Sequence, residues 1–467
     1  MKTPRPRPTN QDSSTTRRGF LRRTALAAAT ISVVPRHVLG GTAGPAPSQR
    51  LNVAAVGVGG MGHNNLNNCK TENIVALCDV DSALAAKAFD ENPKAAKYKD
   101  FRVMFDKQKD IDAVIIATPD HSHAVIGMTA IGHGKHVYIQ KPLAHSVWEA
   151  RMLTEAARKQ KVMSQMGNQG RSNDGARLVC EWIADGAIGA VREVHAWTNR
   201  PVWPQGIEVD RPKETPPVPA SLDWDLWIGP AAMRPYHPTY HPGNWRAWWD
   251  FGTGSLGDLG CHILDAPFWA LKLKYPTSVE ACISTYWHGL WQPTPPKNEN
   301  FPRSTIVRFD FPARENMPEL KLTWWDGGML PPRPAALEPG RRMGDDDGGV
   351  LFVGDKGLLA CGCYGRSPRL IPETRMQQYK QPAHSLPRVP GGQGGHEQDW
   401  VRSCKDGKPS ASNFDQSGPL SEMVLMGNLA VRYPNRKLLW DGEKMAVTND
   451  AEANAYVRRQ YRQGWTL

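Results

Sequence analysis

One stretch of the sequence could place three proton-exchanging side chains on one helix face. In GDLGCHILD, residues 257–265, Asp258, His262 and Asp265 are spaced i, i+4 and i+7, and this spacing brings side chains together on a helix. Carboxylates beside a histidine fix its tautomer and raise its basicity. We therefore expect His262, assisted by Asp258, to take a proton from a substrate hydroxyl, and Asp265 to face the substrate. A structural ion network is the alternative.

A lysine at the end of a predicted strand offers a second reactive group. Gln140-Lys141-Pro142 follows an apolar run that begins at His136. The turn would point the Lys141 ammonium group into a cleft at the strand ends, where ligands of doubly wound sheets bind. There Lys141 could hold the oxygen of a substrate hydroxyl and contact the cofactor together with Gln140. An exposed lysine after an edge strand is the alternative.

The stretch ATPDHSH, residues 117–123, ends another predicted strand. We expect Thr118, Pro119, His121 and His123 to contact the nicotinamide or its ribose. Helix capping and packing is the alternative. No carboxylate at metal-ligand spacing accompanies the two histidines, so we expect no metal.

A glycine-rich loop closes the first apolar run, in LNVAAVGVGGMG at residues 51–62. A G-x-G-x-x-G motif between a strand and a helix is typical of a loop whose N–H groups bind a pyrophosphate. The expected loop contacts are Gly57, Gly59, Gly60, Met61 and Gly62. Asp79 ends the next apolar run, 22 positions after Gly57, close to the spacing of an acid that binds the ribose hydroxyls. Because its charge would repel a 2′-phosphate, we expect NAD rather than NADP. A glycine turn without a ligand is the alternative.

These motifs fall at the ends of strands that alternate with helices. The alternation predicts an α/β fold, a doubly wound parallel sheet over residues 51–170 that binds NAD(P). The expected strands are 53–57, 74–79, 113–118, 136–140 and 162–166. The expected helices are 82–97, 121–133 and 146–159, and the last begins with a capping box of Ser146 and Glu149.

The pattern changes after about residue 170. Strand-like runs with little helix between them predict a second, substrate-binding α/β domain over residues 171–395, built on an open, largely antiparallel sheet. The runs lie at 191–198, 279–287, 304–311, 319–325, 350–353 and 357–361. Two helix candidates, 397–405 and 420–433, lie in a C-terminal part, residues 396–467, that we expect to pack back on the body.

The first 40 residues differ from the rest in charge. Eight Lys and Arg against one Asp give them a net charge of +7 out of +11, which leaves +4 for the remainder and gives no support to nucleic-acid binding. The segment TRRGFLR, residues 16–22, is a twin-arginine signature. We expect a twin-arginine signal at 1–40, a linker at 41–50, a periplasmic or envelope-facing location, and no membrane span apart from the leader. A disordered basic tail is the alternative.

Aromatic residues crowd the predicted loops that would cover the cleft. Flat aromatic faces suit the C–H faces of a sugar ring, and polar neighbours suit its hydroxyls. We therefore expect a small-molecule carbohydrate substrate, contacted by Tyr236, Trp245, Trp248 and Asn168. Core packing of the aromatic residues is the alternative.

In combination and order, GVGGMG, ATPDHSH, QKP and GDLGCHILD resemble the Gfo/Idh/MocA family of glucose-fructose oxidoreductase and inositol dehydrogenase. The resemblance implies a Rossmann domain, a C-terminal α/β domain and a homo-oligomer formed through the C-terminal sheet. It also implies that Lys141, Asp258 and His262 act on the hydroxyl being oxidised while the hydride goes to the nicotinamide. The family's glutamate before the lysine is replaced by Gln140.

The sequence thus favours an NAD-dependent oxidoreductase with a tightly held cofactor, acting on a hydroxyl of a sugar, polyol or glycoside. Transient oxidation of one sugar carbon would acidify its neighbour. An NAD-assisted glycosidase, lyase or epimerase without net redox is therefore a second hypothesis. A sugar-binding scaffold without activity is a third.

Overall fold

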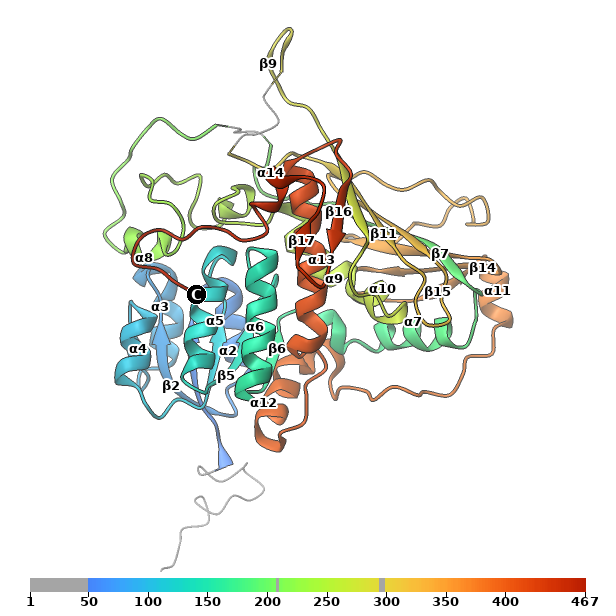
Figure 1. Ribbon diagram of the computed structural model, residues 1–467. Coiled ribbons are helices and arrows are strands. Elements are labelled where there is room, and N and C mark those ends of the chain that lie inside the picture. The colour runs from blue at the N-terminus through green and yellow to red at the C-terminus, as the bar shows by residue number, and fades with distance from the viewer. Residues whose placement is uncertain (1–48, 207–209, 294–298) are drawn as a thin grey trace, which may run out of the picture. The chain divides into compact units, whose positions relative to one another are not determined.

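The computed structural model describes residues 49–206, 210–293 and 299–467 (Figure 1). The predicted twin-arginine signal at 1–40 and most of the predicted linker at 41–50 lie outside the described residues. Residues 51–467 form one compact unit. Within the described ranges, no helix is both long enough and apolar enough to cross a membrane.

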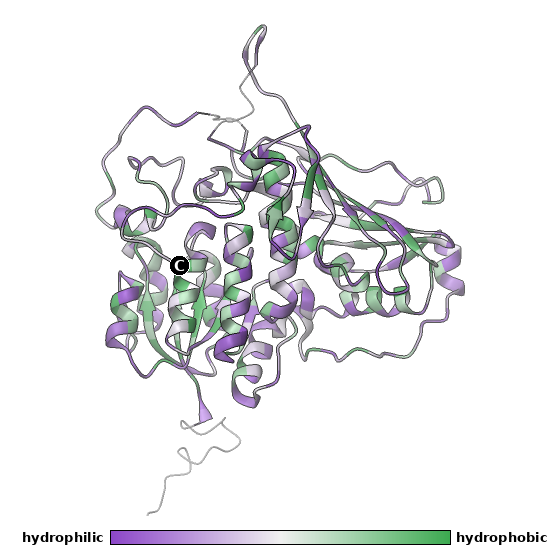
Figure 2. Ribbon diagram, viewed as in Figure 1, coloured by the Kyte–Doolittle hydropathy of each residue, from purple (hydrophilic) through white to green (hydrophobic). Residues whose placement is uncertain are grey.

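A six-stranded parallel sheet occupies the first part of this unit. Its order, β3-β2-β1-β4-β5-β6, is that of a Rossmann fold, so the predicted doubly wound sheet is confirmed. Figure 2 shows its apolar strands in green between helices with polar outer turns in purple. The strands are β1 (Asn52–Val56), β2 (Asn73–Cys78), β3 (Ala96–Tyr98), β4 (Ala113–Ile116), β5 (His136–Ile139) and β6 (Ser164–Met166). The helices are α2 (Gly60–Asn68), α3 (Ser82–Glu91), α4 (Phe101–Lys107), α5 (His123–Gly132) and α6 (Val147–Gln160).

The predicted helix 82–97 is too long. The structure ends α3 at Glu91 and then forms the edge strand β3 and the short helix α4, which the sequence pattern does not predict. The helix stops because Asn92 precedes Pro93, and a residue before proline avoids helical backbone angles. The capping box that opens α6 is confirmed, since Ser146 and Glu149 each bind the other's backbone N–H.

A nine-stranded sheet forms the second part, in the order β15-β14-β13-β7-β12-β11-β8-β16-β17. Only β7 and β12 run parallel among these neighbours, so the predicted open, largely antiparallel sheet is confirmed. Its strands are β7 (Val191–Thr198), β8 (Ser278–Ile283), β11 (Thr305–Phe311), β12 (Leu320–Trp325), β13 (Gly348–Gly354), β14 (Gly357–Gly362), β15 (Arg369–Ile371), β16 (Leu438–Asp441) and β17 (Ala446–Val447). Strands β9 (Trp287–Gly289) and β10 (Gln292–Pro293) form a separate hairpin. The helices of this part are α7 (Asp174–Ala184), α8 (Trp224–Ile228), α9 (Gly254–Ile263), α10 (Asp265–Ala270), α11 (Glu373–Gln378) and α14 (Ala451–Asn454).

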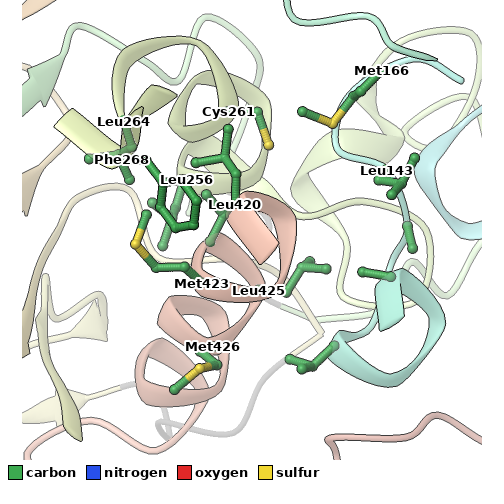
Figure 3. Close-up of a cluster of buried hydrophobic side chains, with 14 of the residues drawn as sticks. Leu143, Met166, Leu256, Cys261, Leu264, Phe268, Leu420, Met423, Leu425 and Met426 are labelled. Atoms are coloured by element: carbon green, nitrogen blue, oxygen red, sulfur yellow. The ribbon is translucent and has the colours of Figure 1, made fainter. Parts of the chain in front are cut away.

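Helix α13 (Phe414–Arg432) joins the two sheets through a shared core. It contacts α6 on the Rossmann side and α9, β8 and β11 on the other. Figure 3 shows Leu420, Met423 and Leu425 of this helix within that core. The structure begins α13 six residues before the predicted start at 420, because Asn413 caps it and Pro419 is accommodated inside it. Helix α12 (His396–Asp406) contacts α2.

Gly62 of α2 lies directly against the loop that precedes it. A Cβ atom there would lie 1.8 Å from the carbonyl oxygen of Gly57, so any side chain requires a backbone shift. We expect Gly62→Ala to lower the free energy of unfolding by about 2 kcal/mol or more, measured by chemical denaturation. Gly132→Ala is the control: its Cβ would meet nothing within 4 Å, so we expect a stabilising change of at most about 1 kcal/mol. Equal stability of the two variants would contradict this account.

Candidate active site

A cavity of roughly 350 Å³ lies at the carboxyl ends of β1, β2, β4 and β5, where doubly wound sheets bind ligands. Residues 222–251, here called the roof, cover it with a buried aromatic cluster that includes Trp227 and Trp245. Most of the predicted cofactor-binding residues line the cavity: Gly57, Gly59, Gly60, Met61, Asp79, Thr118, Pro119, His123, Gln140 and Lys141.

The glycine loop presents bare backbone to this cavity. Gly57 has a φ of +77°, and a Cβ there would meet the backbone of Ala117 at 2.8 Å. Helix α2 begins at Gly60, and no side chain caps its N-terminus. Uncapped N–H groups at a helix start bind anions such as a pyrophosphate. Gly62 does not line the cavity; it allows α2 to approach the loop, so its effect on a ligand is indirect.

Asp79 is held in one orientation at the end of β2. Its carboxylate accepts hydrogen bonds from the backbone N–H of Val58 at 2.8 Å and of Asp81 at 2.9 Å. Burial raises the pKa of Asp79, and these N–H donors counteract the rise. Each carboxylate oxygen keeps a further lone pair for a ligand hydroxyl. The loop and the acid therefore fit the pyrophosphate and a ribose of a dinucleotide.

Lys141 forms a partly buried ion pair with Asp258 of α9. Its Nζ donates to Asp258 Oδ1 at 2.7 Å and to the Asp258 carbonyl oxygen at 2.9 Å. Arg246, in a short helical turn of the roof, donates to the same Oδ1 from 3.3 Å. Burial acts to raise the pKa of Asp258, but Lys141 and Arg246 hold it well below its usual range. The carboxylate therefore stays ionised and fixes the lysine at the cavity wall.

His262 lies one helical turn beyond Asp258 but makes no ion pair with it. Its Nδ1 is buried and has no hydrogen-bond partner, and its ring packs on Tyr364 with centroids 4.6 Å apart. Burial, reinforced by Lys141, lowers the pKa of His262 well below 6.5, and the charge of Asp258 only partly offsets this. The expected rise in basicity is thus wrong: burial and the Lys141 charge favour the neutral imidazole and make His262 a weaker base than a free histidine.

Asp265 does not share a continuous helix face with His262. A break at Leu264 ends α9, and Asp265 opens α10. Its carboxylate accepts from Arg171 at 3.0 Å in the protein interior, away from the cavity lining. The i+7 spacing therefore predicted the wrong partner. Pro267, which has no N–H to bond back to the Ile263 carbonyl oxygen, was the available signal for the break.

Asp120 is a cavity residue that sequence reasoning missed. It lies between the predicted contacts Pro119 and His121, and accepts a hydrogen bond from Thr253 Oγ1 at 2.5 Å. Burial raises its pKa to about 7, while Thr253, Arg246 and Lys141 act against the rise. Its position at the end of a predicted strand could have indicated that it lines the cavity. The prediction named the neighbouring histidines instead.

The two histidines of the stretch 117–123 contact backbone carbonyl groups. The ring nitrogens of His121 lie 2.9 Å and 3.3 Å from the carbonyl oxygens of Trp227 and Phe251, so His121 ties the Rossmann sheet to the roof and does not line the cavity. His123 lines the cavity, but its ring nitrogens face the carbonyl oxygens of Thr118 and Pro142. Burial lowers the pKa of both rings. Packing, the alternative reading, describes both side chains better.

Gln140 belongs to a buried polar network. Its Nε2 donates to Asn65 Oδ1 at 2.8 Å, and Asn65 Nδ2 donates to Glu397 Oε1 at 2.6 Å. Tyr138 donates its hydroxyl to the same oxygen at 3.2 Å. Glu397 comes from α12, far away in sequence. The amide at position 140 thus supplies an N–H donor that a glutamate would lack.

The predicted substrate residues divide between the cavity and the interior. Trp245 lines the cavity with Arg246 stacked 4.3 Å from its ring centroid. Trp248 is buried in the roof and donates its indole N–H to Thr239. Tyr236 packs edge-on against Trp224. Asn168 is buried and accepts from Ser412. Of this group, the structure brings only Trp245 to the cavity.

Two family models match the chain in order. Residues 51–168 match the Gfo/Idh/MocA oxidoreductase family, NAD-binding Rossmann fold, and residues 194–284 match its C-terminal alpha/beta domain. Both matched segments are thus similar to domains of one family, the Gfo/Idh/MocA oxidoreductases. The cavity is lined by residues of both matched segments, and Asp258 and His262 lie in the second.

Curated relatives match the chain over part of its length. Inositol 2-dehydrogenase of Salmonella typhimurium is 31% identical over 151 residues, 31% of this chain and 45% of that protein. Glycosyl hydrolase family 109 protein 2 of Akkermansia muciniphila is 30% identical over 154 residues, 30% of this chain and 32% of that protein. The matched part of the chain thus spans less than half the length of these relatives. A solved complex of levoglucosan dehydrogenase with NADH shares the fold, with a TM-score of 0.53 and 18% identity over 82% of this chain and 98% of that one.

The network around Gln140 predicts that a glutamate there is unfavourable. In Gln140→Glu a carboxylate would face Asn65 Oδ1 without a donor, so we expect a loss of about 1–3 kcal/mol of stability at neutral pH. The loss should shrink at acidic pH, because a protonated carboxyl group regains the donor. Chemical denaturation at several pH values measures this, with Gln377→Glu on the exposed face of α11 as the control. A loss that does not depend on pH would contradict the donor argument.

Proposed function

We propose that the protein is an NAD-dependent oxidoreductase that oxidises a hydroxyl group of a sugar, polyol or glycoside. The observation that carries this proposal is the juxtaposition of the Lys141–Asp258 ion pair with a neutral, unpartnered His262. Lys141 lines the cavity, whereas its partner Asp258 and His262, one turn further along α9, do not. A cation that holds an alcohol oxygen and an imidazole that takes its proton are the two groups that hydroxyl oxidation needs.

Different residues of the chain would then bind the substrate oxygen, accept its proton and hold the cofactor. Lys141, fixed by Asp258, donates a hydrogen bond to the substrate oxygen and stabilises the negative charge that develops there. His262 accepts the hydroxyl proton at its free nitrogen. NAD, when bound, supplies the acceptor for the hydride that leaves the same carbon. Gly57, Gly59 and Gly60 would hold its pyrophosphate, and Asp79 a ribose diol.

Asp79 also supports the choice of NAD over NADP. A 2′-phosphate would bring two negative charges beside this carboxylate, which is already buried. The roof supports a tightly held cofactor, because a ligand beneath it has to leave past the aromatic cluster. Two observations support a carbohydrate substrate. The aromatic ring of Trp245 lines the cavity, and relatives of the chain are named inositol 2-dehydrogenase and levoglucosan dehydrogenase.

The second candidate is an NAD-assisted glycosidase, lyase or epimerase. The similarity to glycosyl hydrolase family 109 proteins favours it. In this reaction the same residues would oxidise one sugar carbon to a ketone, and the neighbouring C–H would lose its acidified proton. In a glycosidase the leaving group would then depart, water would add to the unsaturated ketone, and the hydride would return to the ketone carbon. A lyase would omit the addition of water, and an epimerase would return the proton to the opposite face without losing a group.

Product analysis separates the two reactions. We expect incubation with a panel of aryl glycosides and free sugars, with NAD present, to yield a keto-sugar and an equal amount of NADH. Lys141→Met and His262→Asn should lower the rate by about 10²–10⁴-fold, while Trp291→Ala, in the exposed hairpin, should not. Release of the aryl group without NADH would favour the second candidate. Unchanged turnover in both active-site variants would overturn both.

We also infer export and self-association. The TRRGFLR segment supports twin-arginine export to the periplasm, and retention in the cytoplasm of both the wild type and an Arg17→Lys, Arg18→Lys variant would contradict it. The accessible row Ile306, Thr323 and Trp325 on the nine-stranded sheet supports a homo-oligomer. Light scattering that finds a monomer at micromolar concentration would refute it.

A further inference from the structure

A segment outside both family matches reaches the nucleotide cavity. Residues 459–467, here called the strap, follow α14 and run past the end of the Rossmann sheet (Figure 1). The indole of Trp465 lines the cavity beside Phe101 of α4 and Leu226 of α8. It is half-buried.

The strap is anchored to the roof through Arg462. This arginine donates from Nη1 to Asp225 Oδ1 at 2.6 Å and from Nε to the Gly229 carbonyl oxygen at 2.9 Å. Its backbone N–H donates to Pro230. The N–H of Trp465 bonds back to the Arg462 carbonyl oxygen at 3.1 Å. Main-chain and side-chain contacts together therefore fix where the indole lies.

Helix α4 of the Rossmann part contacts the indole of Trp465 through Phe101 and Arg102. The Arg102 guanidinium lies 4.6 Å from the Trp465 ring centroid, and the ring of Phe101 lies 6.1 Å away. Arg102 is itself paired with Asp100 at 2.7 Å. The indole is thus held between α4 and the roof, where a cation over an aromatic face stabilises it.

The position of Trp465 along the cavity identifies what it would touch. The glycine loop and Asp79 mark the pyrophosphate and the ribose, and Lys141 marks the opposite, reactive end. Beyond Asp79 the wall is mostly apolar, with Val80, Phe101 and Ile126, and Lys99 adds one cation. A flat base next to the Asp79-bound ribose suits such a wall, because aromatic stacking and apolar contact stabilise a planar ring.

We propose that Trp465 forms the outer wall of the adenine pocket, so that the strap is a cofactor-binding element of this chain. This inference rests on the proposed binding of NAD. With Trp465 against the base, a bound nucleotide leaves only when the Arg462–Asp225 contact opens. The strap therefore slows release and makes the cofactor a resident of the site.

Binding measurements with nucleotide fragments test this assignment. We expect Trp465→Ala to weaken ADP-ribose and NAD about 10- to 100-fold, mostly through faster dissociation. Nicotinamide mononucleotide, which has no adenine, should bind as it does to the wild type. Trp465→Phe should restore most of the affinity. Trp291→Ala, in the exposed hairpin, is the matched control and should bind all ligands normally.

Two further variants keep the test decisive if Trp465→Ala is unstable. Arg462→Gln and Asp225→Asn release the strap without removing the indole, and we expect each to speed NAD dissociation severalfold. Normal ADP-ribose affinity in Trp465→Ala, or an equal loss for ADP-ribose and nicotinamide mononucleotide, would overturn the inference while NAD binding by the wild type stands. Absence of NAD binding by the wild type would instead overturn the proposed function.

Discussion

The partly buried ion pair between Lys141 and Asp258 sets the geometry on which the rest of the site depends. Its two members come from the turn after β5 and from α9, and their side chains are 15% and 14% exposed. Removing a charge from water costs several kcal/mol unless an opposite charge meets it, so each side chain holds the other in place. The pairing also leaves His262 without a counter-ion. Burial and the Lys141 charge then keep its ring neutral and lower its basicity.

The enclosure around this pair depends on contacts between the strand ends and the roof. His241 of the roof pairs with Asp81 at 2.9 Å, and Ser82 donates its backbone N–H to Ser221. His121 makes the same connection from the end of β4 through Trp227 and Phe251. Because a site shielded from water strengthens every electrostatic interaction within it, the roof supports both cofactor retention and proton transfer.

The local pattern of the sequence was enough to predict the Rossmann sheet, because each apolar strand there ends at a turn motif. It was also enough to place Gly57, Asp79 and Lys141 at one edge of that sheet, since parallel strands share their carboxyl ends. The local pattern did not predict features that depend on contacts between residues far apart in the sequence. The partner of Asp258, the amide network that joins Gln140 to Glu397, and the arrival of Trp465 at the cavity all depend on residues more than 100 positions apart. The break at Leu264 and the edge strand β3 are local, but short elements with mixed burial leave little periodicity to read.

The central claim is that the cavity holds NAD with its reacting end beside Lys141 and His262. The most direct measurement is a single turnover: protein loaded with NAD is mixed with a panel of sugars and glycosides, and the near-ultraviolet absorbance of reduced nicotinamide is followed. The account predicts that one substrate class produces this band, up to one equivalent per chain. It also predicts no band in Lys141→Met protein loaded with the same amount of NAD. A band of equal size in that variant, or wild-type protein that takes up no NAD, would contradict it.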